Sequence, residues 1–159
     1  MTKLVEIFSD GSCLGNPGAG GYCTILRYKL HKKILTAGFF FTTNNRMELM
    51  GVISGLETLK KSCIIKITTD SQYVKKGITD WIYTWEKQRW QTKKKKLVKN
   101  IDLWLRIHSL IKIHDITWVW VKAHFGHIEN EMCDKIARKS AQNPLFQDIF
   151  YEKNIFYKK

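Results

Sequence analysis

Four carboxylates lie where a cation could be held. Asp10 ends a first apolar run, Glu48 lies in the first turn of a long helical pattern, Asp70 ends a later apolar run, and Asp134 lies inside the last helical pattern. The carboxyl ends of neighbouring strands in an α/β sheet open into one crevice, so Asp10 and Asp70 are expected to meet there. Oxygen ligands without a matching cysteine or histidine cage favour Mg²⁺ or Mn²⁺.

Each acid also has a structural interpretation. Asn45 and Glu48 match the N-cap and N3 positions of a capping box, Asp70 could cap the following helix, and Asp134 could pair with Arg138 at i, i+4. Taken singly, these structural roles are the commoner ones. The set of four acids is harder to explain in this way, because Asp10 and Asp70 would meet at one end of the sheet, where Glu48 and Asp134 could complete a cluster.

The elements that must position these acids follow from the apolar periodicity. Three strands joined by short turns predict an antiparallel meander over 4–10, 22–28 and 33–41. Helices are expected over 45–60, 101–113 and 129–141, with short helical pieces over 71–90. Further strands are expected over 64–69 and 116–121. The pattern predicts an α/β fold in a single domain, with a mixed five-stranded sheet flanked by helices.

The charge points to a polyanionic partner. The 159 residues carry a formal net charge of +13, with a pI near 9.7, which favours nucleic acid. Lysine far outnumbers arginine, so part of this basicity can reflect genome bias. No apolar stretch approaches the length of a spanning helix, and the amino terminus, with Glu6 and Asp10, lacks a signal-peptide profile. A cytoplasmic protein with no membrane association is expected.

The cysteines are widely scattered and form no close pair of the kind found in zinc knuckles, so reduced core residues are expected: Cys13, Cys23, Cys63 and Cys133. A zinc site formed by His124, His127 and Cys133 is the alternative. It has only three soft ligands at irregular spacing. His127 is better explained as a helix-start residue.

Four separated segments then form a recognisable pattern: IFSDGSCLGNPGAGGY, TTNNRMELMG, TTDSQYV and WVKAHFGHIENEMCDKIAR. The chain resembles bacterial type 1 ribonuclease H over residues 4 to about 141, with the motifs in the right order. The resemblance implies a ribonuclease H-like fold, a catalytic domain over 1–143 and a basic protrusion over about 75–104. The aromatic and basic tail, 144–159, receives no structural assignment.

The resemblance also implies a mechanism. Asp10, Glu48, Asp70 and Asp134 would be metal ligands and catalytic residues, binding two Mg²⁺ ions, or Mn²⁺ in their place, once substrate is present. The RNA strand of an RNA–DNA hybrid would be cut to leave 5'-phosphate and 3'-hydroxyl ends. His124 would assist proton transfer or product departure. Ala123, where the family commonly has glycine, and the bulky Phe125 depart from the family pattern and put the turnover rate in doubt.

Hybrid recognition is implied in two regions. Small polar groups would line the minor groove or lie near a DNA phosphate: Cys13, Asn16, Thr43, Asn44, Asn45, Arg46 and Gln72. In the protrusion, aromatic and basic side chains would contact the DNA strand: Trp81, Trp85, Trp104, Lys87 and Lys99. At least two of the tryptophans between 81 and 104 are expected to be structural. Weak sequence preference, salt-sensitive binding and a monomer are expected.

Three alternatives stay open from the sequence. A hybrid-binding module without catalysis would share the fold, and a junction resolvase or integrase-like nuclease would share the acids but not the TTNNRMEL and DSQYV contexts. A basic structural protein would use its acids only as helix caps. One further feature, Gly51 with Gly55 inside the helix of Glu48, indicates close packing or modest stability. The implied cellular roles are removal of RNA primers and of RNA paired with the chromosome.

Overall fold

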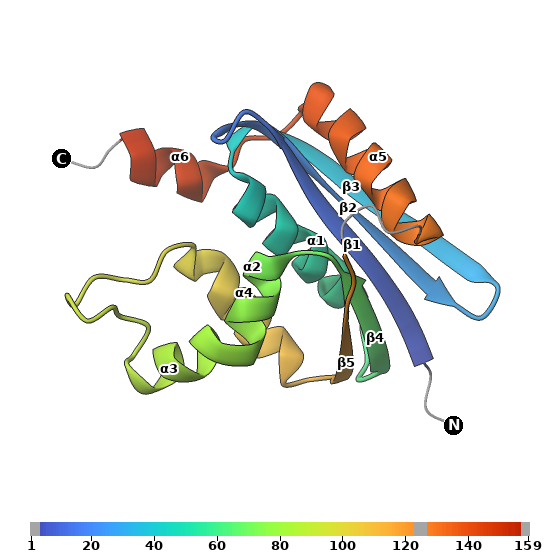
Figure 1. The fold of residues 1–159 in the computed structure, drawn as a ribbon, viewed down its shortest axis with the longest axis horizontal. Helices are drawn as coiled ribbons and strands as arrows, with labels where there is room; N and C mark the ends of the chain where they lie inside the picture. Colours follow the sequence, from blue (N-terminus) through green and yellow to red (C-terminus); the bar gives the residue numbers. More distant parts are fainter. Residues whose placement is uncertain (1–3, 123–126, 157–159) are drawn as a thin grey trace.

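One five-stranded mixed sheet organises the molecule, as expected (Figure 1). The structure is a computed structural model that describes residues 4–122 and 127–156. Its strands are β1 (Leu4–Leu14), β2 (Gly18–Tyr28), β3 (His31–Thr42), β4 (Ile64–Thr69) and β5 (Asp115–Trp120). They lie in the order β3-β2-β1-β4-β5. The meander β1–β3 is antiparallel, whereas β4 and β5 are added in parallel to β1.

Helices cover both faces of the sheet (Figure 1). They are α1 (Asn44–Thr58), α2 (Gln72–Lys76), the π-helix η1 (Gly77–Trp81), α3 (Ile82–Lys87), α4 (Ile101–Ile111), α5 (Ile128–Gln142) and α6 (Ile149–Phe156). Helix α1 packs on β1 and β2 and is backed by α4, while α5 crosses β1, β2 and β3 on the opposite face. This two-sided cover explains why the central stretches of β1 and β2 are buried.

Helix α1 lies unusually close to the sheet. A Cβ added at Gly51 would lie 3.2 Å from the Cβ of Ser9, and one added at Gly55 would lie 2.9 Å from the Cγ2 of Thr24. The Thr24 hydroxyl donates to the Gly51 carbonyl, which fixes the helix on β2. The two glycines therefore serve the close packing that their spacing indicated, and they bring Glu48 near the end of β1.

The face under α5 holds the buried cysteines. Cys23 and Cys133 are fully buried in a small apolar cluster with Phe8, and the Cys133 thiol donates to the Phe8 carbonyl at 3.4 Å. A core role for these two cysteines is therefore confirmed. At the amino end of α5, Arg27 of β2 pairs with Glu129 at 2.6 Å. Buried packing and a surface ion pair together fix α5, and with it Asp134, over β1 and β2.

The C-terminal segment is ordered and helical, which corrects the expectation that the helix over 129–141 is the last regular element. The backbone N–H of Phe40 donates to the Phe146 carbonyl at 2.9 Å, so the segment pairs briefly with β3. Its local apolar pattern is too short to predict a helix, and packing against β3 stabilises it instead.

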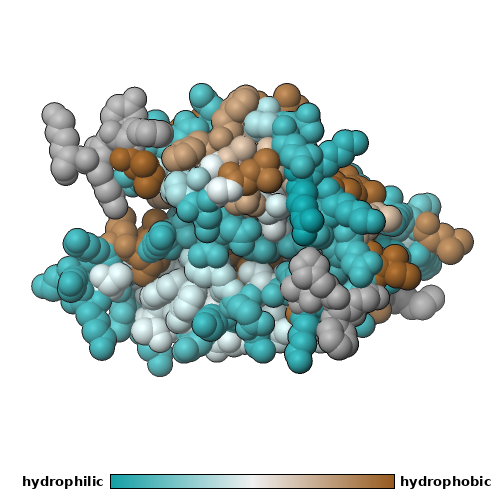
Figure 2. Space-filling view, turned by 45° about the horizontal axis from the view of Figure 1, so that its top comes forward, coloured by the Kyte–Doolittle hydropathy of each residue, from teal (hydrophilic) through white to brown (hydrophobic). Residues whose placement is uncertain are grey.

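The surface view shows mainly hydrophilic side chains with scattered hydrophobic patches (Figure 2). Several side chains of the C-terminal segment are exposed and apolar: Leu145, Phe146, Ile149, Phe150 and Ile155. In the ranges 4–122 and 127–156, no helix has the length and apolar character needed to span a membrane.

Candidate active site

Three carboxylates from three different elements meet at one end of the sheet. Phe8 of β1 pairs with Thr68 of β4, so Asp10 and Asp70 follow at the same level on adjacent parallel strands. Glu48 reaches them from α1. One carboxylate oxygen from each of the three residues lies within 4.8 Å of the other two. The crevice predicted from strand order therefore exists, and it holds these three acids.

The backbone around Asp10 allows this approach. A Cβ at Gly11 would lie 2.5 Å from the backbone nitrogen of Glu48, so only glycine lets α1 come this close to β1. The Gly11 N–H donates to Asp10 Oδ1 at 2.9 Å and holds the carboxylate in place. Local glycine geometry and helix packing thus determine the distance between Asp10 and Glu48.

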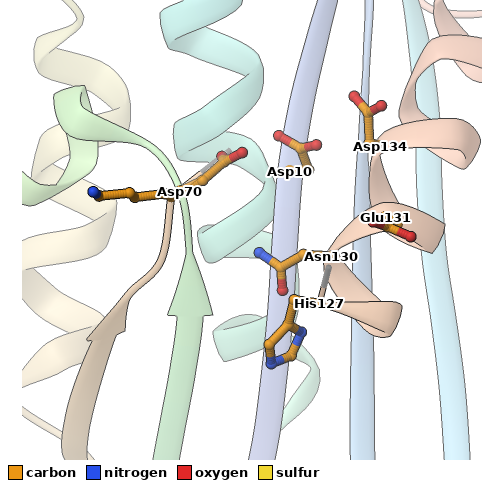
Figure 3. Close-up of a pocket in the computed structure, with 7 residues that line it drawn as sticks. Asp10, Asp70, His127, Asn130, Glu131 and Asp134 are labelled. Carbon is orange, nitrogen blue, oxygen red and sulfur yellow. The ribbon is translucent and has the colours of Figure 1, made fainter. Parts of the chain in front are cut away.

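Asp134 joins the cluster from α5. It lines one cavity with Asp10 and Asp70 (Figure 3), and its charge raises the pKa of Asp10. Asp134 Oδ2 also accepts from Arg138 at 2.8 Å, so the helical ion pair suggested by the sequence is confirmed. The ion pair orients the carboxylate without removing it from the cavity.

The charges in this cluster are poorly compensated. Burial, followed by the neighbouring Asp70 and Asp134, raises the pKa of Asp10 to about 8. Burial, followed by Asp10 and Asp70, raises the pKa of Glu48 well above its ordinary value. Among the described residues, Glu48 Oε2 is buried and has no hydrogen-bond partner. An orphaned carboxylate oxygen beside two more carboxylates is the environment that a hard divalent cation stabilises.

Two expected helix caps are wrong. The N-cap of α1 is Thr43, whose hydroxyl accepts from the Arg46 N–H at 3.2 Å, so Asn45 and Glu48 do not form a capping box. The N-cap of α2 is Ser71, whose hydroxyl accepts from the Val74 N–H at 3.1 Å. Neither Glu48 nor Asp70 is therefore needed to start a helix, which weakens the interpretation of the acids as caps.

Other residues of the cavity were not predicted as site residues. Besides the three aspartates, the lining comprises Lys122, His127, Asn130 and Glu131. Asn130 could have been found from its position four residues before Asp134, since residues so spaced share a helix face. His127 is the N-cap residue of α5, as expected. His124, with Ala123 and Phe125, lies outside the described residues.

The polar residues expected to line the minor groove gather around the start of α1. The backbone N–H of Asn44 donates to Asn16 Oδ1 at 3.2 Å, which links the start of α1 to the β1–β2 turn. Cys13 is half-buried, and its thiol lies 3.6 Å from the Thr42 carbonyl. Thr43, Asn45 and Gln72 keep exposed surface. Tertiary contacts thus assemble one polar surface from three segments.

Two residues expected to contact nucleic acid are corrected by their burial. Arg46 is only 2% exposed, and its guanidinium is bound by Asp102 and Asp148, so it has no surface to offer to a DNA phosphate. Trp104 is fully buried, and its indole N–H donates to the Tyr73 hydroxyl at 3.0 Å. Both side chains are structural, because contacts from distant segments enclose them.

The other residues of the protrusion that were expected to contact nucleic acid keep accessible surface. Trp81 and Trp85 are half-buried and line a second pocket with Tyr73 and Lys99. Their rings pack 5.7 Å apart and adjoin the core. Lys87 and Lys99 are exposed. An aromatic surface beside lysines suits a sugar–phosphate strand.

The chain is similar to known proteins over almost its whole length. A family model described as RNase H matches residues 2–142. The ribonuclease H of Buchnera aphidicola subsp. Schizaphis graminum is 73% identical over 159 residues, which is 100% of this chain and 99% of that protein. The ribonuclease H of Erwinia tasmaniensis is 58% identical over 151 residues, covering 95% and 97%.

A solved structure gives the same result. LC9-RNase H1, described as a type 1 RNase H with the type 2 active-site motif, superposes with a TM-score of 0.82 at 30% identity. The match covers 91% of this chain and 75% of that one. The resemblance to bacterial type 1 ribonuclease H is confirmed, and the chain therefore belongs to the ribonuclease H family and is an enzyme of that class.

Proposed function

We propose that this enzyme hydrolyses the RNA strand of RNA–DNA hybrids at the cavity lined by Asp10, Asp70 and Asp134, with two divalent cations and with Mg²⁺ as the preferred ion. Family membership supports the substrate class and the reaction. The observation that carries the metal requirement is the cluster of Asp10, Glu48 and Asp70, in which a buried Glu48 oxygen has no partner among the described residues.

The carboxylates would divide the work of holding cations. Asp10 would belong to both ligand sets, since it lies within 4.8 Å of Glu48 and Asp70 and shares the cavity with Asp134. When bound, divalent cations supply Lewis acidity that activates water and offsets charge on the phosphate and the leaving oxygen. Gly11 and Arg138 keep Asp10 and Asp134 oriented through their hydrogen bonds.

Hydrolysis adds the oxygen of water to phosphorus and breaks the bond from phosphorus to the ribose 3'-oxygen. The products would carry 5'-phosphate and 3'-hydroxyl ends. His124 would take part in proton transfer or product departure, as the family resemblance implies. Cations would stabilise Asp10 and Glu48 as carboxylates, because burial and neighbouring acids raise the pKa of both groups when no cation is bound.

The hybrid would lie across two surfaces. The polar surface at the start of α1, with Cys13, Asn16, Asn44, Asn45 and Gln72, suits recognition of 2'-hydroxyls, which distinguish RNA from DNA. Trp81, Trp85 and the exposed lysines of the protrusion suit the DNA strand. Action as a monomer in the cytoplasm, on primer RNA and chromosome-paired RNA, stays a prediction from the resemblance.

A cleavage assay tests the proposal. Wild type, Asp10→Asn and the surface control Asp115→Asn would each receive a labelled RNA–DNA hybrid, single-stranded RNA or duplex DNA, with and without Mg²⁺. Wild type and Asp115→Asn should cut only the RNA of the hybrid, only with metal, while Asp10→Asn should be inactive. Tight hybrid binding by wild type without cleavage, in Mg²⁺ and in Mn²⁺, would favour a binding module instead.

A further inference from the structure

Asn130 lies in the cavity without a structural task that the described residues reveal. It occupies the first turn of α5, four residues before Asp134, and lines the cavity with Asp10 and Asp70. Figure 3 shows its side chain reaching from α5 toward β1, below Asp10, with the nitrogen end of the amide on the side of Asp70. The amide thus lies in the cavity where the proposed function would place the scissile phosphate.

The amide is not held by other side chains in the described part of the chain. Within the ranges 4–122 and 127–156, Asn130 Oδ1 is buried without a hydrogen-bond partner. Leaving a buried polar atom unpaired costs roughly 1 to 3 kcal/mol, so such atoms are uncommon outside functional sites. His127, at the same cavity, shares this feature, since among the described residues its Nδ1 is also buried without a hydrogen-bond partner, but its ring packs on Phe8 and its Nδ1 lies 3.6 Å from Glu129 Oε2.

The chemistry of the cavity gives the amide a use. Most of the polar groups that line it are carboxylates, which accept hydrogen bonds and repel a phosphodiester. The donors of the lining are the Asn130 amide, the His127 imidazole and the exposed ammonium group of Lys122. An amide can donate to a phosphate oxygen without adding a positive charge that would pair with the carboxylates and compete with cations for them.

We propose that Asn130 is a further substrate-contacting residue of this site, whose Nδ2 donates a hydrogen bond to a non-bridging oxygen of the scissile phosphate. The inference rests on the proposed function, since it assigns a contact within that reaction. The contact orients the phosphate between Asp10 and Asp134. This hydrogen bond is a single contact to one phosphate and would position that phosphate for the reaction. It would add little to the overall affinity for the hybrid, because the lysines dominate that affinity.

The test compares Asn130→Ala, Asn130→Ser and Asn130→Asp with wild type in Mg²⁺. Loss of a hydrogen bond to a charged partner should lower kcat/KM about 10- to 100-fold in the alanine variant. The Kd for the uncut hybrid, measured without divalent metal, should change less than about threefold. Asn130→Asp should be slower than Asn130→Ala, because it removes the donor and adds a charge that repels phosphate.

A substrate modification locates the contact. One non-bridging oxygen of a single scissile phosphate is replaced by sulfur, a poorer acceptor, and both diastereomers are cut by wild type and by Asn130→Ala. On one diastereomer the substitution should slow wild type at least about fivefold more than it slows the variant, because the variant has already lost the donor. A purely structural role would leave the two sulfur effects equal, and this equality would overturn the proposal.

Controls separate folding from contact. Thermal unfolding shows whether each variant is folded, and Asn130→Ser provides a second small substitution if the alanine variant is not. Asn143→Ala, at the exposed C-terminal end of the same helix, should retain wild-type kcat/KM. Wild-type activity in Asn130→Ala, or activity of Asn130→Asp above that of Asn130→Ala, would also contradict the proposal. Failure of wild type to cut any hybrid would instead contradict the proposed function.

Discussion

Arg46 and Asp148 join the first turn of α1 to the C-terminal segment through two hydrogen bonds, from Nε to Oδ2 at 2.7 Å and from Nη2 to Oδ1 at 3.0 Å. The same guanidinium donates to both carboxylate oxygens of Asp102, at 2.8 and 2.7 Å. The Thr42 hydroxyl completes the site by donating to Asp148 Oδ2 at 2.7 Å. The buried guanidinium of Arg46 therefore connects α1, the start of α4 and the segment before α6.

Arg46→Met should destabilise the protein by about 3 to 5 kcal/mol, because Asp148 and Asp102 would then be left without their cation. Urea unfolding measures the free energy. The matched control is Arg106→Met, which removes a similar two-bond pair with Glu57 whose side chains are both 43% exposed. Its expected loss is at most about 1 kcal/mol. If both variants lost the same free energy of unfolding, burial would not be the reason for the larger contribution expected of Arg46.

Without metal, Asp10→Asn should be more stable than wild type, and this difference should grow as pH rises. Because the folded-state pKa of Asp10 is raised from 3.8 to about 8, the folded protein holds a proton in this window that the unfolded chain releases. Wild-type stability therefore falls as pH increases from about 4 to about 8. The variant should exceed wild type by roughly 2 kcal/mol at pH 8 and by little near pH 4.

Urea unfolding in a chelating buffer at several pH values checks this expectation. Asp115→Asn, which changes an exposed aspartate, serves as the control and should follow the wild-type curve. A difference between Asp10→Asn and wild type that does not vary with pH would show that repulsion within the cluster is not its source.

Mg²⁺ should raise the melting temperature of wild type in the absence of nucleic acid, because cations offset the repulsion among Asp10, Glu48 and Asp70. An ion present at about 100 times its Kd stabilises by roughly 2.7 kcal/mol. Glu48→Gln should shrink this shift, and a chelator should abolish it in wild type. Equal shifts in wild type and in Glu48→Gln, measured by scanning calorimetry, would place the ion elsewhere.

Gly77→Ala should be strongly destabilising, by about 2 kcal/mol or more, because an added Cβ would overlap the fully buried ring of Trp104. Gly15→Ala is a useful comparison. Gly15 has a φ of +78°, but an added Cβ would meet only the Pro17 carbonyl oxygen at an ordinary 3.4 Å, so its substitution should cost only about 1 kcal/mol. Thermal unfolding of both variants tests whether Trp104 acts as a rigid core residue.

Hybrid binding should weaken steeply as salt increases. Lys99→Ala and Lys87→Ala should each reduce the slope of log K against log salt by about 1, because each removes one phosphate contact. Lys29→Ala, in the β2–β3 turn, should leave the slope unchanged. Fluorescence anisotropy of a labelled hybrid at several salt concentrations, without divalent metal, provides the measurement. Unchanged slopes in all three variants would exclude the protrusion as the phosphate-binding surface.

The sequence predicted the strands, most of the helices and the acids at their ends, but not the contacts between these elements. Alternating and continuous apolar runs report which strands are buried, so the meander and the two parallel additions were predicted correctly. Asp10, Glu48 and Asp70 were also found from the sequence, because their positions at strand ends and in a first helical turn are local features. The C-terminal helix was missed, since α6 is short and depends on packing against β3.

Arg46, Trp104 and Asn130 show what only tertiary structure decides. By type and position, Arg46 and Trp104 suit nucleic acid, but the partners that bury Arg46 lie 56 and 102 residues away in the chain. Burial and pairing between distant segments have no local sequence signal. The sequence alone therefore determined the element types and the acids at their ends, whereas folding decided which side chains remain available, because availability depends on neighbours that the chain brings together only in three dimensions.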